Sequence, residues 1–326
     1  MKKLSMTTGK STFAPSTITF NSLLSAIGRS KRQDIGDQVM NVLKYMEDLD
    51  NEYSHISSRP NIVTYNSAIS ILGKANRFEE AKNLFYQVCA VKPQIVNTIT
   101  YNSFLNALSW RPSRDASHQA LSVLKEMNEP NTRTYNTVMK VLSKNKCYDQ
   151  MEGLLDQMEN LSKKRTPLII PNTITYATLI SAYTRSSRPD KISRVMNVLK
   201  RMDSAKKAGN EFAVPDTKIY NGILKSNLYS NSMKNVSSLE MNETLENARE
   251  IFQIMMSSSS SKCNPDEFTY AVMFQILAKN IPGRNERLEE ISNLFMSCRE
   301  DGMNNGYVLS ELRKVIPKSL YQELTR

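Results

Sequence analysis

The chain has 326 residues, of which 43 are Lys or Arg and 32 are Asp or Glu, so its formal net charge at pH 7 is +11. Hydrophobic residues make up 40% and charged residues 23%, an ordinary composition that excludes a collagen-like or wholly disordered chain. No apolar run in the sequence approaches the ~18–20 residues that span a bilayer, and the excess of positive charge points toward polyanionic partners.

The residues that usually support catalysis are sparse or dispersed. The four cysteines form no Cys-x-x-Cys pair, a pattern that favours a reducing compartment over a disulfide framework. The two histidines are too few to supply the paired ligands of a zinc site, and the glycines form no phosphate-cradling loop. We therefore expect no enzyme activity, no metal and no cofactor.

The strongest signal in the sequence is a short motif that recurs seven times. It reads Pro-Asn-Ile-Val-Thr-Tyr-Asn at residues 60–66 and Pro-Asn-Thr-Arg-Thr-Tyr-Asn at residues 130–136, with looser copies elsewhere. Successive copies lie 34 to 50 residues apart, which indicates a unit of about 35 residues stretched by insertions. The aromatic residue of the motif marks each repeat in turn: Phe20, Tyr65, Tyr101, Tyr135, Tyr176, Tyr220 and Tyr270.

Each unit shows helical periodicity twice. In repeat two, apolar residues from Val63 onward predict a first helix that ends near residues 73–76, and an apolar stripe from Phe78 to Val88 predicts a second. The proline of the next motif ends the unit, and the Asn or Asp after it can cap the following helix. A helix pair is too small to bury its own apolar face, so we expect an all-α solenoid of stacked hairpins.

This pattern predicts three parts of the chain. Residues 1–14 are interpreted as the tail of a truncated preceding repeat, residues 15–306 as seven repeats with insertions, and residues 307–326 as a C-terminal capping helix. The insertions lie mainly before the prolines, at 51–59, 162–170 and 205–213, whereas repeat six has a polar stretch at 230–242. Because residues 1–4 match the ends of second helices, we expect the native coding sequence to extend upstream, with at least one more repeat and a targeting segment.

The segments VTYNSAISILGKANRFEEAKNLFYQV and TITYATLISAYTRSSRPDKISRVMNVLKRM resemble pentatricopeptide repeats of the plain type. The resemblance extends over about residues 14–305. It implies a right-handed α-solenoid of helix-turn-helix repeats that binds single-stranded RNA, usually in a mitochondrion or chloroplast, with one base recognised per repeat. Two features depart from the family pattern: most units exceed 35 residues, and no nuclease or editing domain follows the array.

The resemblance assigns base recognition to two positions of each repeat. When the aromatic residue is numbered position four, the residue at position five and the residue that closes the repeat contact the edge of one base. Position five holds Asn21, Asn66, Asn102, Asn136, Ala177, Asn221 and Ala271. The closing position holds Asn61, Asn97, Asn131, Asn172, Asp216 and Asp266.

An asparagine amide both donates and accepts hydrogen bonds, so it can pair with a pyrimidine edge. By the resemblance, repeats one to four select pyrimidines, repeat six selects uracil, and repeat five, with Ala177 and Asp216, is assigned no base. The alternative is that the closing residues only cap helices, and the two roles can coexist. Capping explains position five less well, because Asn inside a first turn lowers helix propensity relative to Ala.

Two further columns complete the predicted RNA interface. By the resemblance, the side chain at position two would pack flat against a base; the alternative is that it packs in the core. Position two holds Ile18, Val63, Ile99, Arg133 and Ile174, followed by Lys218 and Phe268. Eight residues after position five, a mainly basic column could bind phosphate or complement helix C-termini. It consists of Arg29, Lys74, Lys144, Arg185 and Lys279, together with Trp110 and Tyr229. The aromatic residues at position four are expected to pack between helices.

Three functions compete at this point. The first is a sequence-selective adaptor for a pyrimidine-rich single strand of RNA, without catalysis and without a membrane. The second is a scaffold that binds proteins, although the Trp-Leu-Gly-Tyr pattern of tetratricopeptide repeats is missing. The third is an RNA-processing enzyme, which the sequence disfavours because paired carboxylates such as Glu79–Glu80 and Glu289–Glu290 belong to separate repeats.

Overall fold

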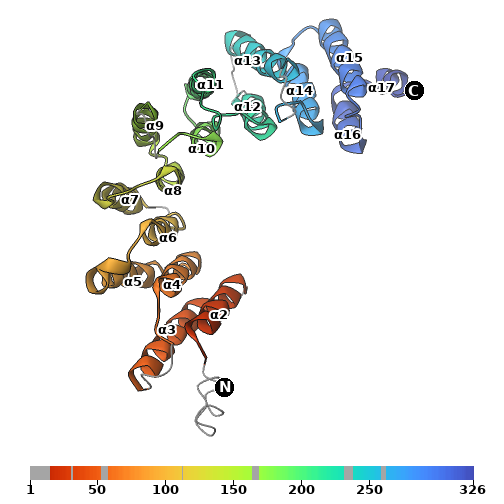
Figure 1. Cartoon of the computed structure of the whole chain (residues 1–326). Helices are drawn as coiled ribbons and strands as arrows, with labels where there is room; N and C mark the ends of the chain where they lie inside the picture. Colours follow the sequence, from red (N-terminus) through yellow and green to blue (C-terminus); the bar gives the residue numbers. More distant parts are fainter. Residues whose placement is uncertain are drawn as a thin grey trace. The chain divides into compact units, whose positions relative to one another are not determined.

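The computed structural model describes residues 15–30, 32–52, 58–111, 113–163, 169–230, 238–257 and 262–326. Over these ranges the chain forms α-helices and one short 3-10 turn, and it contains no strand (Figure 1). The expected all-α fold is therefore confirmed. The chain divides into two compact units, Met1–Ile170 and Pro171–Arg326, and each is described by itself. The predicted tail of a preceding repeat, residues 1–14, lies outside the described residues.

Both units consist of consecutive helical hairpins. The first contains α2 (Thr17–Arg29), α3 (Ile35–Glu52), α4 (Ile62–Lys74), α5 (Phe78–Val91), the 3-10 turn η2 (Pro93–Ile95), α6 (Thr98–Leu108), α7 (Arg114–Glu126), α8 (Thr132–Lys144) and α9 (Tyr148–Ser162). The second contains α10 (Thr173–Thr184), α11 (Lys191–Lys207), α12 (Thr217–Ser230), α13 (Ser238–Met256), α14 (Glu267–Asn280), α15 (Arg284–Glu300), α16 (Gly306–Val315) and α17 (Lys318–Leu324). The C-terminal segment, expected to be one capping helix, thus forms α16 and α17.

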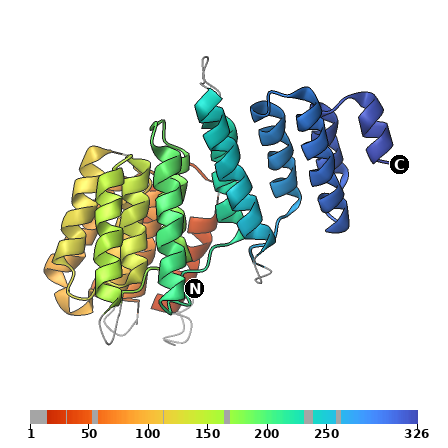
Figure 2. The same ribbon diagram turned by 90° about the horizontal axis from the view of Figure 1, so that it is seen from above.

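The first helices of successive repeats pack directly on one another. In the first unit this layer runs through α2, α4, α6 and α8, and in the second through α10, α12, α14 and α16. The second helices cover the layer, and most of them also contact the first helix of the next repeat, as α5 contacts α6. Figure 2 shows the helices of the first unit lying side by side along the stack.

One glycine permits a close approach within this layer. A Cβ atom added to Gly73 on α4 would lie 2.5 Å from the Cβ of Ala107 and 2.6 Å from its Cα on α6. Such distances are far below a van der Waals contact, so only hydrogen at residue 73 allows α4 and α6 to pack this tightly.

The position-four aromatic residues form the centre of the hairpins. Tyr65, Tyr135, Tyr176 and Tyr270 are all buried. Their hydroxyl groups keep partners where they reach the edge of the core: Lys92 Nζ donates to the Tyr65 hydroxyl at 2.8 Å. The expectation that these rings pack between helices is therefore confirmed for these four, whereas Tyr101 is half-buried.

In five of the seven repeats, a threonine at position one ties the repeat to the start of the next, whereas repeats two and seven have Ile62 and Glu267 there. Thr17 Oγ1 donates to the carbonyl of Arg59 at 2.9 Å, and Thr132 Oγ1 donates to the carbonyl of Ile170 at 3.0 Å. The acceptor always immediately precedes the proline of the next motif. The same bond joins Thr98 to Glu129, Thr173 to Val214 and Thr217 to Asn264. In these five repeats, the segment that precedes the next motif is thereby fixed to the first helix of its own repeat.

Candidate functional site

The closing residues begin the first helices as N-caps. Asn61 Oδ1 accepts hydrogen bonds from the backbone N–H of Thr64 at 3.1 Å and from its hydroxyl, while the Asn61 N–H donates to Thr64 Oγ1. The same reciprocal capping box occurs at Asn97, Asn131, Asn172 and Asp266. The closing residues therefore cap these helices, a role that can coexist with base recognition. The cap uses Oδ1 alone, so the second polar atom of each side chain takes no part in it.

The structure brings position five and the closing position together. Asn221 Nδ2 donates to Asp266 Oδ1 at 2.9 Å, and the Thr269 hydroxyl donates to Asn221 Oδ1 at 2.7 Å. Repeat one has the same arrangement, with Asn21 Nδ2 3.5 Å from Asn61 Oδ1. The two predicted columns thus lie beside each other in these repeats, linked by the position-three threonine that the sequence analysis did not single out.

Two position-five residues have an unsatisfied polar atom. The Oδ1 atoms of Asn66 and Asn102 are buried and have no hydrogen-bond partner within the described part of the chain. Leaving a buried acceptor unpaired costs about 1–3 kcal/mol. A side chain that served only to hold the fold together would not be expected to retain this cost, so these atoms are consistent with a binding role.

Position two faces solvent rather than the core. Four aliphatic side chains of this column are largely exposed: Ile18 at 77%, Val63 at 53%, Ile99 at 62% and Ile174 at 61%. Arg133 and Lys218 are exposed as well, and Phe268 is half-buried. The core-packing alternative is therefore wrong for the aliphatic members. Exposed apolar side chains recur at the same helical position, so this column is a candidate for contact with a ligand.

The basic column is also exposed, at Arg29, Lys74, Lys144, Arg185 and Lys279. Trp110 interrupts it, and the ammonium groups of Lys140 and Lys144 lie 5.6 and 5.0 Å from its ring centre. Burial, followed by the charge of Lys144, lowers the pKa of Lys140. Cation–π contacts of this kind hold the two positive charges on the surface of the first unit.

Two members of the basic column donate hydrogen bonds within the second unit, Lys279 to the preceding first helix and Arg185 within its own helix region. Lys279 Nζ donates to the carbonyl of Leu228 at 2.9 Å, and burial lowers the pKa of Lys279. Arg185 Nη1 donates to Ser181 Oγ at 2.8 Å. The side chain of Tyr229 lies outside the described residues.

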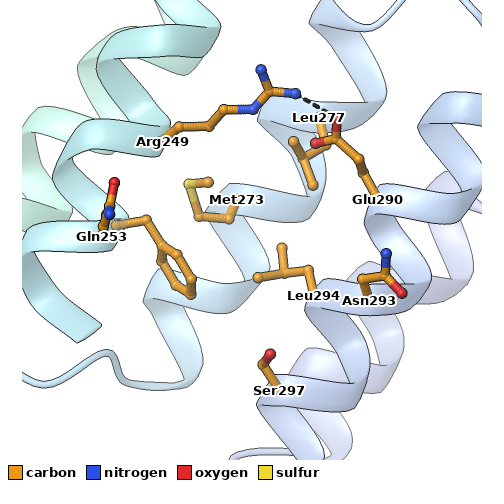
Figure 3. A pocket seen from close by; sticks show the side chains of 9 residues that line it. Arg249, Gln253, Met273, Leu277, Glu290, Asn293, Leu294 and Ser297 are labelled. Atoms are coloured by element: carbon orange, nitrogen blue, oxygen red, sulfur yellow. Dashed lines mark hydrogen bonds and ion pairs between the residues drawn. The ribbon is translucent and has the colours of Figure 1, made fainter. Parts of the chain in front are cut away.

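A shallow cavity of about 280 Å³ lies elsewhere in the second unit, among α13, α14 and α15. Figure 3 shows its apolar floor, with Met273 and Leu294, and the ion pair between Arg249 and Glu290 across it. Its lining contains no residue of the four predicted columns. The cavity is therefore separate from the candidate site.

The described ranges lack two features that would indicate other functions. No helix there is long and apolar enough to cross a membrane. No group of three His, Cys, Asp or Glu side chains is placed to hold a metal ion. The polar columns on the first helices thus remain the candidate site.

Comparison with protein families matches the repeats directly. The model of the "PPR repeat" family matches residues 63–89, 133–162 and 174–204, and that of the "Pentatricopeptide repeat domain" matches residues 10–75. A chloroplastic pentatricopeptide repeat-containing protein of Arabidopsis thaliana is 29% identical over 127 residues, which are 38% of this chain and 24% of that protein.

Among solved structures, the fold is similar to the pentatricopeptide repeat protein PPR10 from maize. The TM-score is 0.50 with 20% identity, over 91% of this chain and 41% of that one. The structure of PPR10 in complex with an 18-nucleotide psaJ RNA element gives a TM-score of 0.49 with 18% identity, over 95% of this chain and 43% of that one. The chain thus spans less than half the length of these relatives.

Proposed function

Because this chain is a pentatricopeptide repeat protein, we propose that it binds single-stranded RNA and selects pyrimidines, acting by binding rather than by catalysis. The observation that carries the proposal is the pairing of Asn221 with Asp266 beside a column of exposed apolar side chains. Polar pairs give base selection, and apolar side chains give stacking surfaces, as single-stranded RNA requires.

The caps explain how Asn and Asp would differ in base selection. Capping occupies Oδ1, so a closing Asn offers its Nδ2 donor to a base and a closing Asp offers its Oδ2 acceptor. Uracil carries an N–H donor at N3 where cytosine carries an acceptor, so Asp266 favours uracil in repeat six. The Asn–Asn pairs of repeats one to four accept either pyrimidine, and repeat five, with Ala177, selects none.

The other two columns would hold the strand irrespective of sequence. Ile18, Val63, Ile99 and Ile174 offer apolar surfaces against base faces, and Arg133 can stack through its planar guanidinium. Arg29, Lys74, Lys144, Arg185 and Lys279 supply positive charge for the phosphates. These side chains provide affinity, while the polar pairs provide selectivity.

The cellular setting follows the family pattern and the relative. The Arabidopsis protein is named as chloroplastic, which supports an organelle, mitochondrion or chloroplast, as the location of this chain. The bound transcript would be stabilised, processed, spliced or translated according to the proteins that act beside it. The exposed apolar column could also bind a peptide. A protein-binding scaffold is therefore the alternative function that the binding test must distinguish from RNA binding.

The test measures binding to labelled oligouridylate, oligoadenylate and duplex RNA over a range of salt. We expect tighter binding of oligouridylate and a log–log salt slope of about −0.7 for each phosphate contact. The triple variant K74E/K144E/R185E should weaken binding to all sequences alike. Equal affinity for duplex and single strand, or affinity independent of salt, would overturn the proposal in favour of a protein partner.

A further inference from the structure

The C-terminal helix α16 has the register of a first helix although the repeat motif is absent there. It packs on α14 as α14 packs on α12. Asn305 caps it, because Oδ1 accepts hydrogen bonds from the N–H of Tyr307 at 3.0 Å and of Val308 at 3.1 Å. In this register Asn305 is the closing residue of repeat seven, and Tyr307 stands at position two of an eighth first helix.

The two position-two residues at this end of the array are both aromatic. Tyr307 is 47% exposed, and Phe268 on α14 is half-buried. Lys225 Nζ lies 5.9 Å from the centre of the Phe268 ring, so a positive charge accompanies this surface. Aromatic faces of this kind stack on any base, because every base has a π-face.

The polar groups that would select a base are missing or engaged here. Position five of repeat seven is Ala271, which is fully buried and carries only a methyl group. The amide of Asn305 is engaged within the protein, because it donates from Nδ2 to Glu267 Oε1 at 3.2 Å. Repeat seven therefore combines stacking surfaces with no group to recognise the edge of a base.

We propose that Phe268 and Tyr307 stack one further nucleobase of the same RNA strand, beyond the base bound by repeat six, without selecting its identity. This inference rests on the proposed function. It makes α16 part of the RNA-binding surface, in addition to covering the end of the helix layer.

The experiment compares hexauridylate with heptamers that carry one extra adenosine, guanosine or abasic residue at either end. The pyrimidine-selecting repeats should reject a purine. A heptamer therefore cannot place its extra purine in one of these repeats by sliding one position along the array. At one end, adenosine and guanosine should tighten binding equally, by about tenfold, and the abasic residue should not. Y307A should remove this gain, whereas Y307F should retain it.

A matched control is Y86A, which removes an exposed tyrosine from the second helix α5 and should leave the gain intact. Two results overturn the inference while the proposed function stands: hexauridylate binds without any gain from the seventh nucleotide, or the gain differs between adenosine and guanosine. If the chain binds no hexauridylate, the proposed function itself fails.

Discussion

Asn221 and Asp266 are 45 residues apart in the chain, yet Asn221 Nδ2 lies 2.9 Å from Asp266 Oδ1. The same Oδ1 caps α14, at 2.9 Å from the N–H of Thr269. One oxygen thus joins a helix start to the preceding repeat. The capping atom and the atom that we propose contacts a base are therefore different atoms of one side chain, and substitution can change them separately.

The first prediction uses this separation in repeat three. N131D keeps Oδ1, and so keeps the cap to Thr134, but it replaces the Nδ2 donor by an acceptor oxygen. We expect the preference at one RNA position to change from either pyrimidine to uracil over cytosine, by about 1–3 kcal/mol if the contact resembles a good bidentate one. Selection from randomised RNA measures the change.

The control for this prediction is N131A, which removes both atoms. Loss of an asparagine cap should lower the free energy of unfolding by about 1 kcal/mol, whereas N131D should preserve it. If N131D and wild type select the same sequence while both remain stably capped, the closing column has no part in base selection.

The second prediction concerns position five. N66T shortens the side chain, which gives a purine room to approach, and it keeps a hydroxyl for hydrogen bonding. Because the family pattern pairs Thr and Asn with adenine, preference at one RNA position should move from pyrimidine to adenine, with the remaining positions unchanged. The same selection experiment tests it. A uniform loss of affinity would identify Asn66 as structural.

The third prediction concerns packing of the first helices. G73A places a methyl group within 2.6 Å of the Ala107 backbone and should lower the free energy of unfolding by about 1–3 kcal/mol. G153A on α9 meets open space, so it should raise the free energy of unfolding by about 0.5–1 kcal/mol through helix propensity. Chemical denaturation distinguishes the two, and equal effects would contradict the close approach of α4 and α6.

The fourth prediction is loss of stability in alkali. Burial, with smaller effects from Cys263 and Asp203, raises the pKa of Tyr220 to about 12. Between pH 10 and about 12 the unfolded chain loses this proton while the folded chain keeps it, so the free energy of unfolding falls as pH rises. Y220F should make unfolding less sensitive to pH in this window. An unchanged pH dependence in that variant would rule Tyr220 out as the cause.

The paired helices of the repeats could be predicted from the sequence because they depend on local patterns. The first helix of repeat two was expected to end near residues 73–76, and α4 ends at Lys74. The exposure of Val63 could not be predicted in this way, because an apolar residue in an apolar run indicates a core position. Val63 is exposed because of its position on the first helix relative to the neighbouring repeats, although its side chain is apolar.

The contacts between repeats were also beyond the sequence pattern. The threonines at positions one and three recur, but their bonds join residues about 40 positions apart, as from Thr17 to Arg59. The register of α16 was missed for a different reason. Its start, Asn305–Gly306–Tyr307, keeps the capping residue, but Leu309 stands where every earlier repeat has Phe or Tyr, and Val308 stands where most have threonine.

The bond from each position-one threonine to the residue before the next proline has a consequence for how such arrays vary. An insertion can grow or shrink as a loop whose far end is anchored, so its length does not alter the spacing of the helices that follow. The position of a repeat along a bound strand would then depend on how many helix pairs precede it, and not on how many residues precede it. Repeats as unequal as those of this chain can therefore keep a common step, and loop lengths are free to diverge or to be redesigned.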